Sequence, residues 1–231
     1  MLNRIKKILG SKIEGDTLNF GDLDRLTPVS RKFGIDRGSR SVARYYIDQF
    51  IESHANDIQG HVLEIGDPQY TKKYGGNRVS ESDVLNYASD NPNATIIADL
   101  TKANEIESNT FDCIILAQTL QFIYDFNSAL YHTHRICKPG GVVLVTLSGI
   151  SQISTYDMER WGEYWRFTSC SAKKLFENFF QNSKIQIKSF GNVFSATAFL
   201  YGFSADEIPS EKLDYSDEGY EVIIAIRAIK N

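Results

Sequence analysis

The fold is decided by residues 111–147, which read FDCIILAQTLQFIYDFNSALYHTHRICKPGGVVLVTL. Two strand-like runs, at 111–120 and 141–147, enclose a segment at 126–137 that has the spacing of an amphipathic helix. The second run is apolar throughout instead of alternating with polar residues, which is typical of a strand buried on both faces. The order strand, helix, strand therefore predicts part of a parallel sheet covered by helices.

The same alternation extends in both directions along the chain. Further strands are predicted at 61–66, 78–85, 94–100, 184–191 and 221–229, and further helices at 41–55 and 171–180. Strands that alternate with helices indicate an α/β fold, doubly wound and Rossmann-like, with helices on both faces of a mostly parallel sheet. No internal repeat and no shift in composition marks a domain boundary.

The composition of the 231 residues limits the classes of function. Lys and Arg total 25 and Asp and Glu total 29, so the net charge of −4 does not favour a broad nucleic-acid-binding surface. The longest apolar stretch, at 140–150, is far shorter than the roughly 20 residues of a membrane-spanning helix. Residues 1–10 lack the apolar core of a secretion signal, and three widely spaced cysteines favour reduced thiols. We therefore expect a cytoplasmic protein with no membrane span.

Polar residues and a glycine stand where the predicted strands end. Glu64 and Gly66 close the first strand, Asp83 ends the second, Asp99 ends the third and Gln118 follows the fourth. Ligands of open α/β sheets bind outside the carboxyl ends of the strands, so these loops are the expected binding site. The 17 residues from Gly66 to Asp83 are close to the spacing at which an acidic side chain binds a ribose, although acidic residues also end strands for structural reasons.

The order of these pieces resembles the motif series of class I S-adenosylmethionine-dependent methyltransferases. The resemblance covers residues 60–150 and rests on VLEIG at 62–66, SD at 82–83, ADL at 98–100, FDCIILAQTLQFI at 111–123 and HRICKPGGVVLVTL at 134–147. Within that class the chain looks like the type 11-like branch associated with bacterial polysaccharide and glycosyltransferase genes. Its members have a segment similar to FGIDRGSRSVARYYIDQFI, at 33–51, before the first strand.

The resemblance implies a seven-stranded sheet with an antiparallel last strand, S-adenosylmethionine as cofactor, and a set of residues that bind it. It predicts an N-terminal segment and lid helix at 1–59 and one compact methyltransferase domain at 60–231. Glu64 and Gly66 would flank the methionine portion with Asp67, and Asp83 would bind the ribose hydroxyls. The remaining predicted contacts are to adenine and the sulfonium, by Asp99, Leu100 and Gln118.

The first loop departs from the family pattern. Pro68 and Tyr70 stand where the second and third glycines of the usual E/DxGxGxG motif would be, and both add bulk where a ligand approaches the backbone. Two interpretations follow. Either the loop has shifted and Gly75 and Gly76 supply the freedom, or the chain is a cofactor-free interaction or scaffold domain for a glycosyltransferase partner or a homodimer.

Residues for the methyl acceptor are predicted in the long segment at 148–169 and in the segment before the first strand. The candidates to orient or deprotonate a hydroxyl are Asp157, Glu159 and Glu163. The first two do not suffice to predict a metal site. Residues predicted to bind the acceptor are Tyr156 and Trp161, whose rings suit a sugar, Arg166, which suits a carboxylate or phosphate, and Arg37, Arg44 and Tyr45. Packing of these side chains onto the sheet is the structural alternative. The expected reaction is O-methylation of a sugar or small-molecule hydroxyl on a polysaccharide or glycoconjugate pathway.

Overall fold

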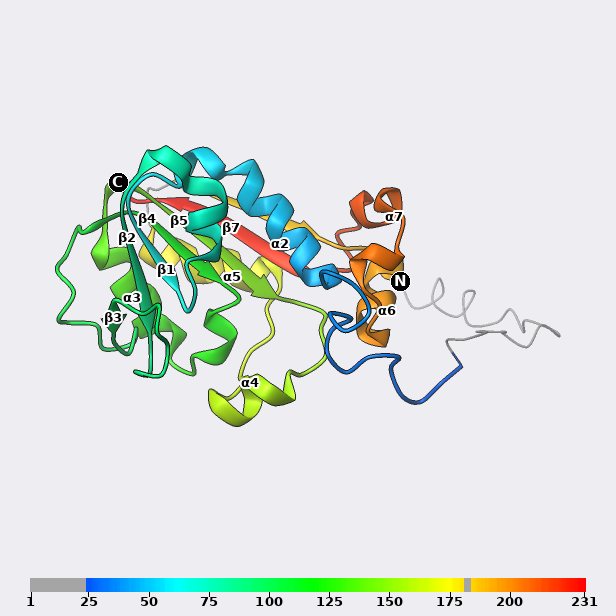
Figure 1. Cartoon of the computed structure of the whole chain (residues 1–231). Helices are drawn as coiled ribbons and strands as arrows, with labels where there is room; N and C mark the ends of the chain where they lie inside the picture. Colours follow the sequence, from blue (N-terminus) through cyan, green and yellow to red (C-terminus); the bar gives the residue numbers. More distant parts are fainter. Residues whose placement is uncertain (1–23, 181–183) are drawn as a thin grey trace, which may run out of the picture.

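The computed structural model describes residues 24–180 and 184–231 and contains one seven-stranded sheet (Figure 1). The strand order is β3-β2-β1-β4-β5-β7-β6. The parallel strands are β1 (Gly60–Ile65), β2 (Val79–Asn86), β3 (Ile96–Ile97), β4 (Phe111–Ala117) and β5 (Cys137–Ser148). β7 (Ile223–Ile229) is antiparallel to both of its neighbours, β5 and β6 (Ile185–Phe190). The predicted doubly wound sheet with an antiparallel last strand is confirmed.

Helices cover both faces of the sheet, which explains the consecutive apolar residues in the middle of its central strands, such as 113–116 of β4 and 142–145 of β5. In β4, Ile114 and Leu116 face one core, which α3 (Phe126–Ile136) and α5 (Ser169–Phe179) complete. Cys113 and Ile115, at the alternate positions, face the other core, which α2 (Val42–Ser53), α6 (Val193–Tyr201) and α7 (Ser210–Asp214) complete. Within the described ranges, no helix combines the length and apolarity needed to cross a membrane.

The helix α2 packs into the second core through its apolar face. Ser41 caps its first turn by accepting a hydrogen bond from the Arg44 N–H (3.1 Å). The apolar face that follows the cap is buried against the sheet, through Val42, Tyr46, Ile47, Phe50 and Ile51. Lifting α2 would expose this face. The lid role predicted for 1–59 stays a prediction, and residues 1–23 of that segment lie outside the described part.

The segment before α2 is held by the insertion between β6 and β7. The Arg37 guanidinium donates to the Glu207 carboxylate (Nε to Oε2, 3.0 Å), and the Ser204 hydroxyl donates to the carbonyl of Arg40 (2.8 Å). Ser41 and Ser204 form an isolated antiparallel bridge. These contacts fix the segment across the end of the sheet at which the parallel strands terminate (Figure 1).

Candidate functional site

The loop after β1 is folded around a buried carboxylate. Glu64 accepts hydrogen bonds from the backbone N–H groups of Tyr70 (3.0 Å) and Thr71 (2.8 Å) and from the Thr71 hydroxyl (2.8 Å). The carbonyl of Pro68 accepts from the N–H of Lys72 (3.0 Å), so Pro68 begins a helical turn, where its missing N–H has no cost. Glu64 therefore shapes the loop, and its predicted contact with the cofactor stays a prediction.

Stability depends on pH through this carboxylate. Burial raises the pKa of Glu64, and hydrogen bonds from Thr71 and Tyr70 oppose the rise. Since the folded pKa lies above the unfolded one, the folded state binds more protons between the two values, and stability falls as pH rises through that window. We expect the melting temperature of wild type minus that of Glu64→Gln to decrease as pH rises from 4.5, the ordinary value, through the folded pKa. A constant or increasing difference would contradict this assignment.

Two adjoining cavities lie at this end of the described sheet, and the larger one, of about 670 Å³, opens beyond the carboxyl ends of β1 to β4. Gly66 follows β1, Asn86 ends β2, Asp99 follows β3 and Gln118 follows β4, and all four line it. Its aromatic lining comprises Tyr87, Phe122, Tyr124, Trp161 and Tyr164. The larger cavity thus lies at the reversal of strand order between β1 and β4, where open α/β sheets bind ligands.

The structure brings together only part of the set predicted to bind the cofactor. Four predicted residues line the larger cavity: Gly66, Asp99, Leu100 and Gln118. Three do not: Glu64, Asp67 and Asp83. Glu64 shapes the loop after β1, and Asp67 is exposed outside the cavity.

Asp83 was predicted to end the second strand, and this placement is wrong. It lies inside β2, opposite Leu63 of β1, and the strand continues to Asn86. The Asp83 carboxylate lies 2.7 Å from Nε2 of His61 and accepts a hydrogen bond from the Thr95 hydroxyl (2.6 Å). The neutral amide of Asn86 therefore takes the strand-end position that the prediction gave to a carboxylate.

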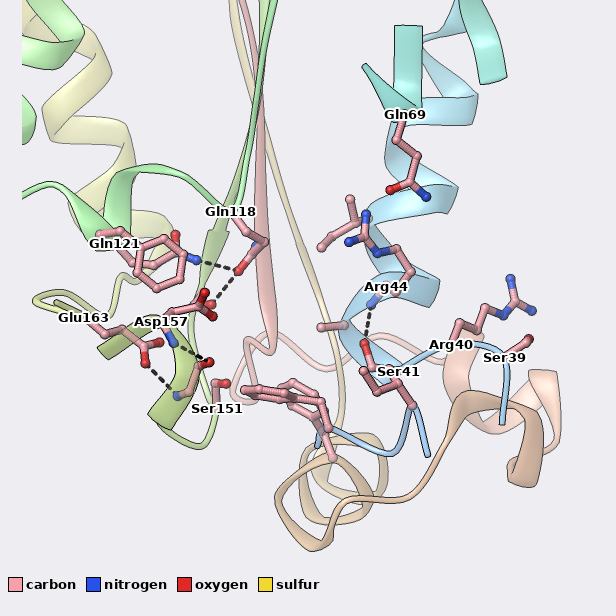
Figure 2. Close-up of a pocket in the computed structure, with 18 residues that line it drawn as sticks. Ser39, Arg40, Ser41, Arg44, Gln69, Gln118, Gln121, Ser151, Asp157 and Glu163 are labelled. Atoms are coloured by element: carbon pink, nitrogen blue, oxygen red, sulfur yellow. Dashed lines mark hydrogen bonds between the residues drawn. The ribbon is translucent and has the colours of Figure 1, made fainter. Parts of the chain in front are cut away.

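Gln118 is held in a strained conformation at the edge of the larger cavity. Its φ of 53° lies in the left-handed region, which residues other than glycine rarely adopt. Its N–H donates to the carbonyl of Thr146 (3.0 Å), and its side-chain oxygen accepts from the Ser148 hydroxyl (2.6 Å) and the Gln121 amide (2.9 Å; Figure 2). These bonds fix the side chain, as is typical of strained residues at functional sites.

The smaller cavity, of about 380 Å³, adjoins the larger one. Gln118, Phe122 and Asp157 line both cavities. Figure 2 shows one wall formed by residues that follow β4 and β5, and a facing wall that carries Arg44 of α2 and Gln69 of the first loop. The two cavities therefore meet beyond the end of β4.

Two predicted catalytic carboxylates differ in their surroundings. Asp157, on α4 (Thr155–Arg160), lines both cavities, and its carboxylate has no hydrogen-bond or ion-pair partner among the residues that the structure describes. Glu163 lines the smaller cavity, but its side chain is only 4% exposed. It accepts from the Ser154 N–H (2.8 Å) and pairs with Arg166 (2.7 Å). Asp157 is therefore the available proton acceptor, and Glu163 is occupied in holding the segment.

Two of the six residues predicted to bind the acceptor line a cavity. Arg44 lines the smaller one, and Trp161 lines the larger one. The ring of Trp161 packs edge-on against Tyr87, with centroids 6.2 Å apart. Trp161 therefore connects the segment after β5 to the end of β2, across the larger cavity.

The other four predicted residues line neither cavity because each is engaged elsewhere: Arg37, Tyr45, Tyr156 and Arg166. The Tyr45 hydroxyl donates to Asp214 (2.7 Å), and the ring of Tyr156, which is 64% exposed, stacks under the guanidinium of Arg160 (3.4 Å). The prediction that these four contact the acceptor is not supported by their positions.

Sequence reasoning missed Asn86, Tyr87 and Gln121. The sequence does indicate the position of Asn86 and Tyr87. Val84 and Leu85 continue the apolar strand beyond Asp83, so the next polar residue, Asn86, lies at the strand end. Gln121 is 2% exposed and supports Gln118, and nothing in the sequence separates it from an ordinary loop residue.

The fold and the position of the larger cavity define a Rossmann-like methyltransferase fold. Residues 38–145 match a family model described as a methyltransferase domain. This part of the chain therefore resembles a methyltransferase domain, which supports the predicted enzyme class and cofactor. The matched range includes α2, consistent with its place in the core.

Solved structures agree on the fold. The YcgJ protein from Bacillus subtilis is 14% identical with a TM-score of 0.51, covering 81% of this chain and 99% of that chain. A methyltransferase from Thermotoga maritima, described as a possible histamine N-methyltransferase, is 15% identical with a TM-score of 0.53, covering 82% and 91%. A methyltransferase from Archaeoglobus fulgidus is 13% identical with a TM-score of 0.50, covering 81% and 90%. No curated protein sequence matches the chain.

Proposed function

We propose that the chain transfers a methyl group from S-adenosylmethionine, held in the larger cavity, to a hydroxyl of a small molecule or glycan in the smaller cavity. The acceptor is a sugar or related metabolite of cytoplasmic polysaccharide or glycoconjugate biosynthesis. The observation that carries the proposal is the junction of the two cavities at Gln118, Phe122 and Asp157. Methyl transfer is an in-line displacement, so donor and acceptor sites must adjoin in this way.

The residues present fit the cofactor. Gly66 has a φ of 84°, and a Cβ built there meets no heavy atom within 4 Å. The backbone is thus bare where it borders the larger cavity, despite the bulk of Pro68 and Tyr70, which face away from it in the helical turn. The cavity volume of about 670 Å³ suits a nucleoside-sized ligand. Polar groups stand at the ends of three further strands, in Asn86, Asp99 and Gln118.

Each residue then has a proposed role. The backbone of Gly66 borders the methionine portion, Asn86 donates to or accepts from the ribose hydroxyls, and Asp99 and Leu100 border the adenine. One oxygen of Asp99 already accepts from the N–H (2.9 Å) and hydroxyl (2.7 Å) of Thr101, which leaves the other for the ligand. Gln118 lies nearest the junction of the cavities and faces the reacting atoms.

The chemistry assigns one proton transfer to the chain. S-adenosylmethionine supplies a methyl group on a sulfonium and leaves as S-adenosylhomocysteine. Asp157 accepts the proton that the acceptor hydroxyl loses as its oxygen bonds to the methyl carbon. The walls of both cavities orient the acceptor and exclude water, and Glu163 keeps the segment of Asp157 in place through Ser154.

Titration calorimetry with S-adenosylhomocysteine tests the proposal. We expect micromolar binding to wild type and about tenfold weaker binding to Asn86→Ala, because one to two hydrogen bonds are lost. The matched control is Asp83→Asn, three residues earlier in β2 and outside the cavity, which should bind like wild type. Absence of binding to wild type would contradict the enzyme and favour the cofactor-free scaffold; weakening by Asp83→Asn alone would restore the original ribose assignment.

A further inference from the structure

The charges around the smaller cavity are mostly paired. Two arginines and two carboxylates line it. Nε of Arg40 lies 3.7 Å from the Asp206 carboxylate, and Glu163 pairs with Arg166 at 2.7 Å. This pairing leaves one cation, Arg44, and one anion, Asp157, without a partner of opposite charge among the described residues.

Arg44 forms no ion pair with any of the described residues. One terminal nitrogen donates to the Tyr70 hydroxyl. Burial raises the pKa of Tyr70, so this phenol stays neutral and contributes no negative charge. The nearest acid on the same helix, Asp48, pairs instead with Lys73 (3.2 Å). Nε and the second terminal nitrogen of Arg44 have no hydrogen-bond partner in the part of the chain that the structure describes.

The two unpaired charges lie on opposite walls. Figure 2 shows Arg44 on α2 at one side and Asp157 on α4 at the other, with the cavity between them. A guanidinium with two free nitrogens matches the two oxygens of a carboxylate or phosphate. The opposite wall offers a carboxylate acceptor for a hydroxyl proton. The smaller cavity is thus complementary to a molecule that carries an anionic group at one end and a hydroxyl at the other.

We propose that the methyl acceptor is an anionic small molecule, a sugar acid or sugar phosphate, whose anionic group binds Arg44 while its hydroxyl faces Asp157. This inference rests on the proposed function and specifies its substrate class. From the sequence, the anionic group was assigned to Arg166, which pairs with Glu163; it is assigned instead to Arg44, which has no ion-pair partner among the described residues. Carboxylate and phosphate share this chemistry, and the probes below distinguish them.

The experiment measures binding of three sugars to protein saturated with S-adenosylhomocysteine. The probes are glucuronate, glucose 6-phosphate and neutral methyl glucoside. We expect at least one anionic probe to bind wild type about tenfold or more tightly than the neutral one, and Arg44→Gln to remove this preference. Arg44→Lys, which keeps the charge without the planar fork, should retain part of it.

Controls separate recognition from folding and from the proposed function. Arg31→Gln removes an exposed arginine of the segment before α2 that lines neither cavity, and it should keep the full preference. The melting temperature of each variant reports its fold. Equal binding of all probes, binding of none, or a preference that survives Arg44→Gln would overturn the inference. Failure of wild type to bind S-adenosylhomocysteine in the preceding titration would instead overturn the proposed function itself.

Discussion

Gly66→Leu is expected to weaken binding of S-adenosylhomocysteine by about 100-fold or more, which is about 2.7 kcal/mol. A side chain at residue 66 meets no protein atom near its Cβ and extends into the larger cavity, where the ligand must lie. The left-handed φ of 84° adds a folding cost of about 1–2 kcal/mol. Calorimetry measures the first effect, and denaturant unfolding measures the second.

Gly76→Leu separates these two effects. Gly76 follows the same loop, has a φ of 57°, and a Cβ built there also meets nothing within 4 Å, but it lies outside both cavities. We expect a similar loss of stability and unchanged affinity. If both variants lost affinity equally, the effect would come from the loop conformation and not from occupation of the larger cavity.

Asp157→Asn is expected to lower kcat by about 100-fold to 10,000-fold, the usual contribution of a positioned general base. The amide keeps the size of the side chain and cannot accept the hydroxyl proton. Binding of S-adenosylhomocysteine should change little, because the strand-end residues that hold it are intact. The measurement is formation of S-adenosylhomocysteine with the tightest sugar acid or sugar phosphate as acceptor.

Glu159→Gln is the matched control for this variant. Glu159 lies on the same helix, is exposed and lines neither cavity, so its removal changes the charge of α4 by the same amount. We expect its kcat to equal that of wild type. Equal losses in the two variants would show that the charge of α4, and not proton transfer by Asp157, matters.

The sequence predicted the fold well because the sheet is buried on both faces. Ile114 and Ile115 point to different cores, so the consecutive positions 113–116 of β4 are all apolar, and this pattern can be recognised in the sequence alone. The position of the binding site followed from the same strands, since Gly66, Asp99 and Gln118 stand just beyond strand ends. The local sequence pattern was sufficient to place a residue whenever its position depends only on where the preceding strand ends.

The predictions failed where a role depends on partners distant in the sequence. Arg37 and Arg44 are similar residues of one segment, and only the contact of Arg37 with Glu207, 170 residues away, removes it from the site. The same holds for Tyr45, which is engaged by Asp214. The placement of Asp83 at a strand end was wrong for a different reason. The predicted end of the strand was three residues too early, and the Asp83 side chain therefore lies away from the edge of the sheet.

The bridge between Ser41 and Ser204 has a consequence for the order of events during synthesis on the ribosome. The four strand ends that border the larger cavity lie within residues 60–118. The ribosome therefore releases them before residues 157–164, which also line this cavity. The wall that carries Arg44 is secured by residues 204–207, and β7, which joins β6 to the sheet, emerges later still. A nascent chain therefore contains the strand ends of the larger cavity before it contains the residues that hold the facing wall of the smaller one.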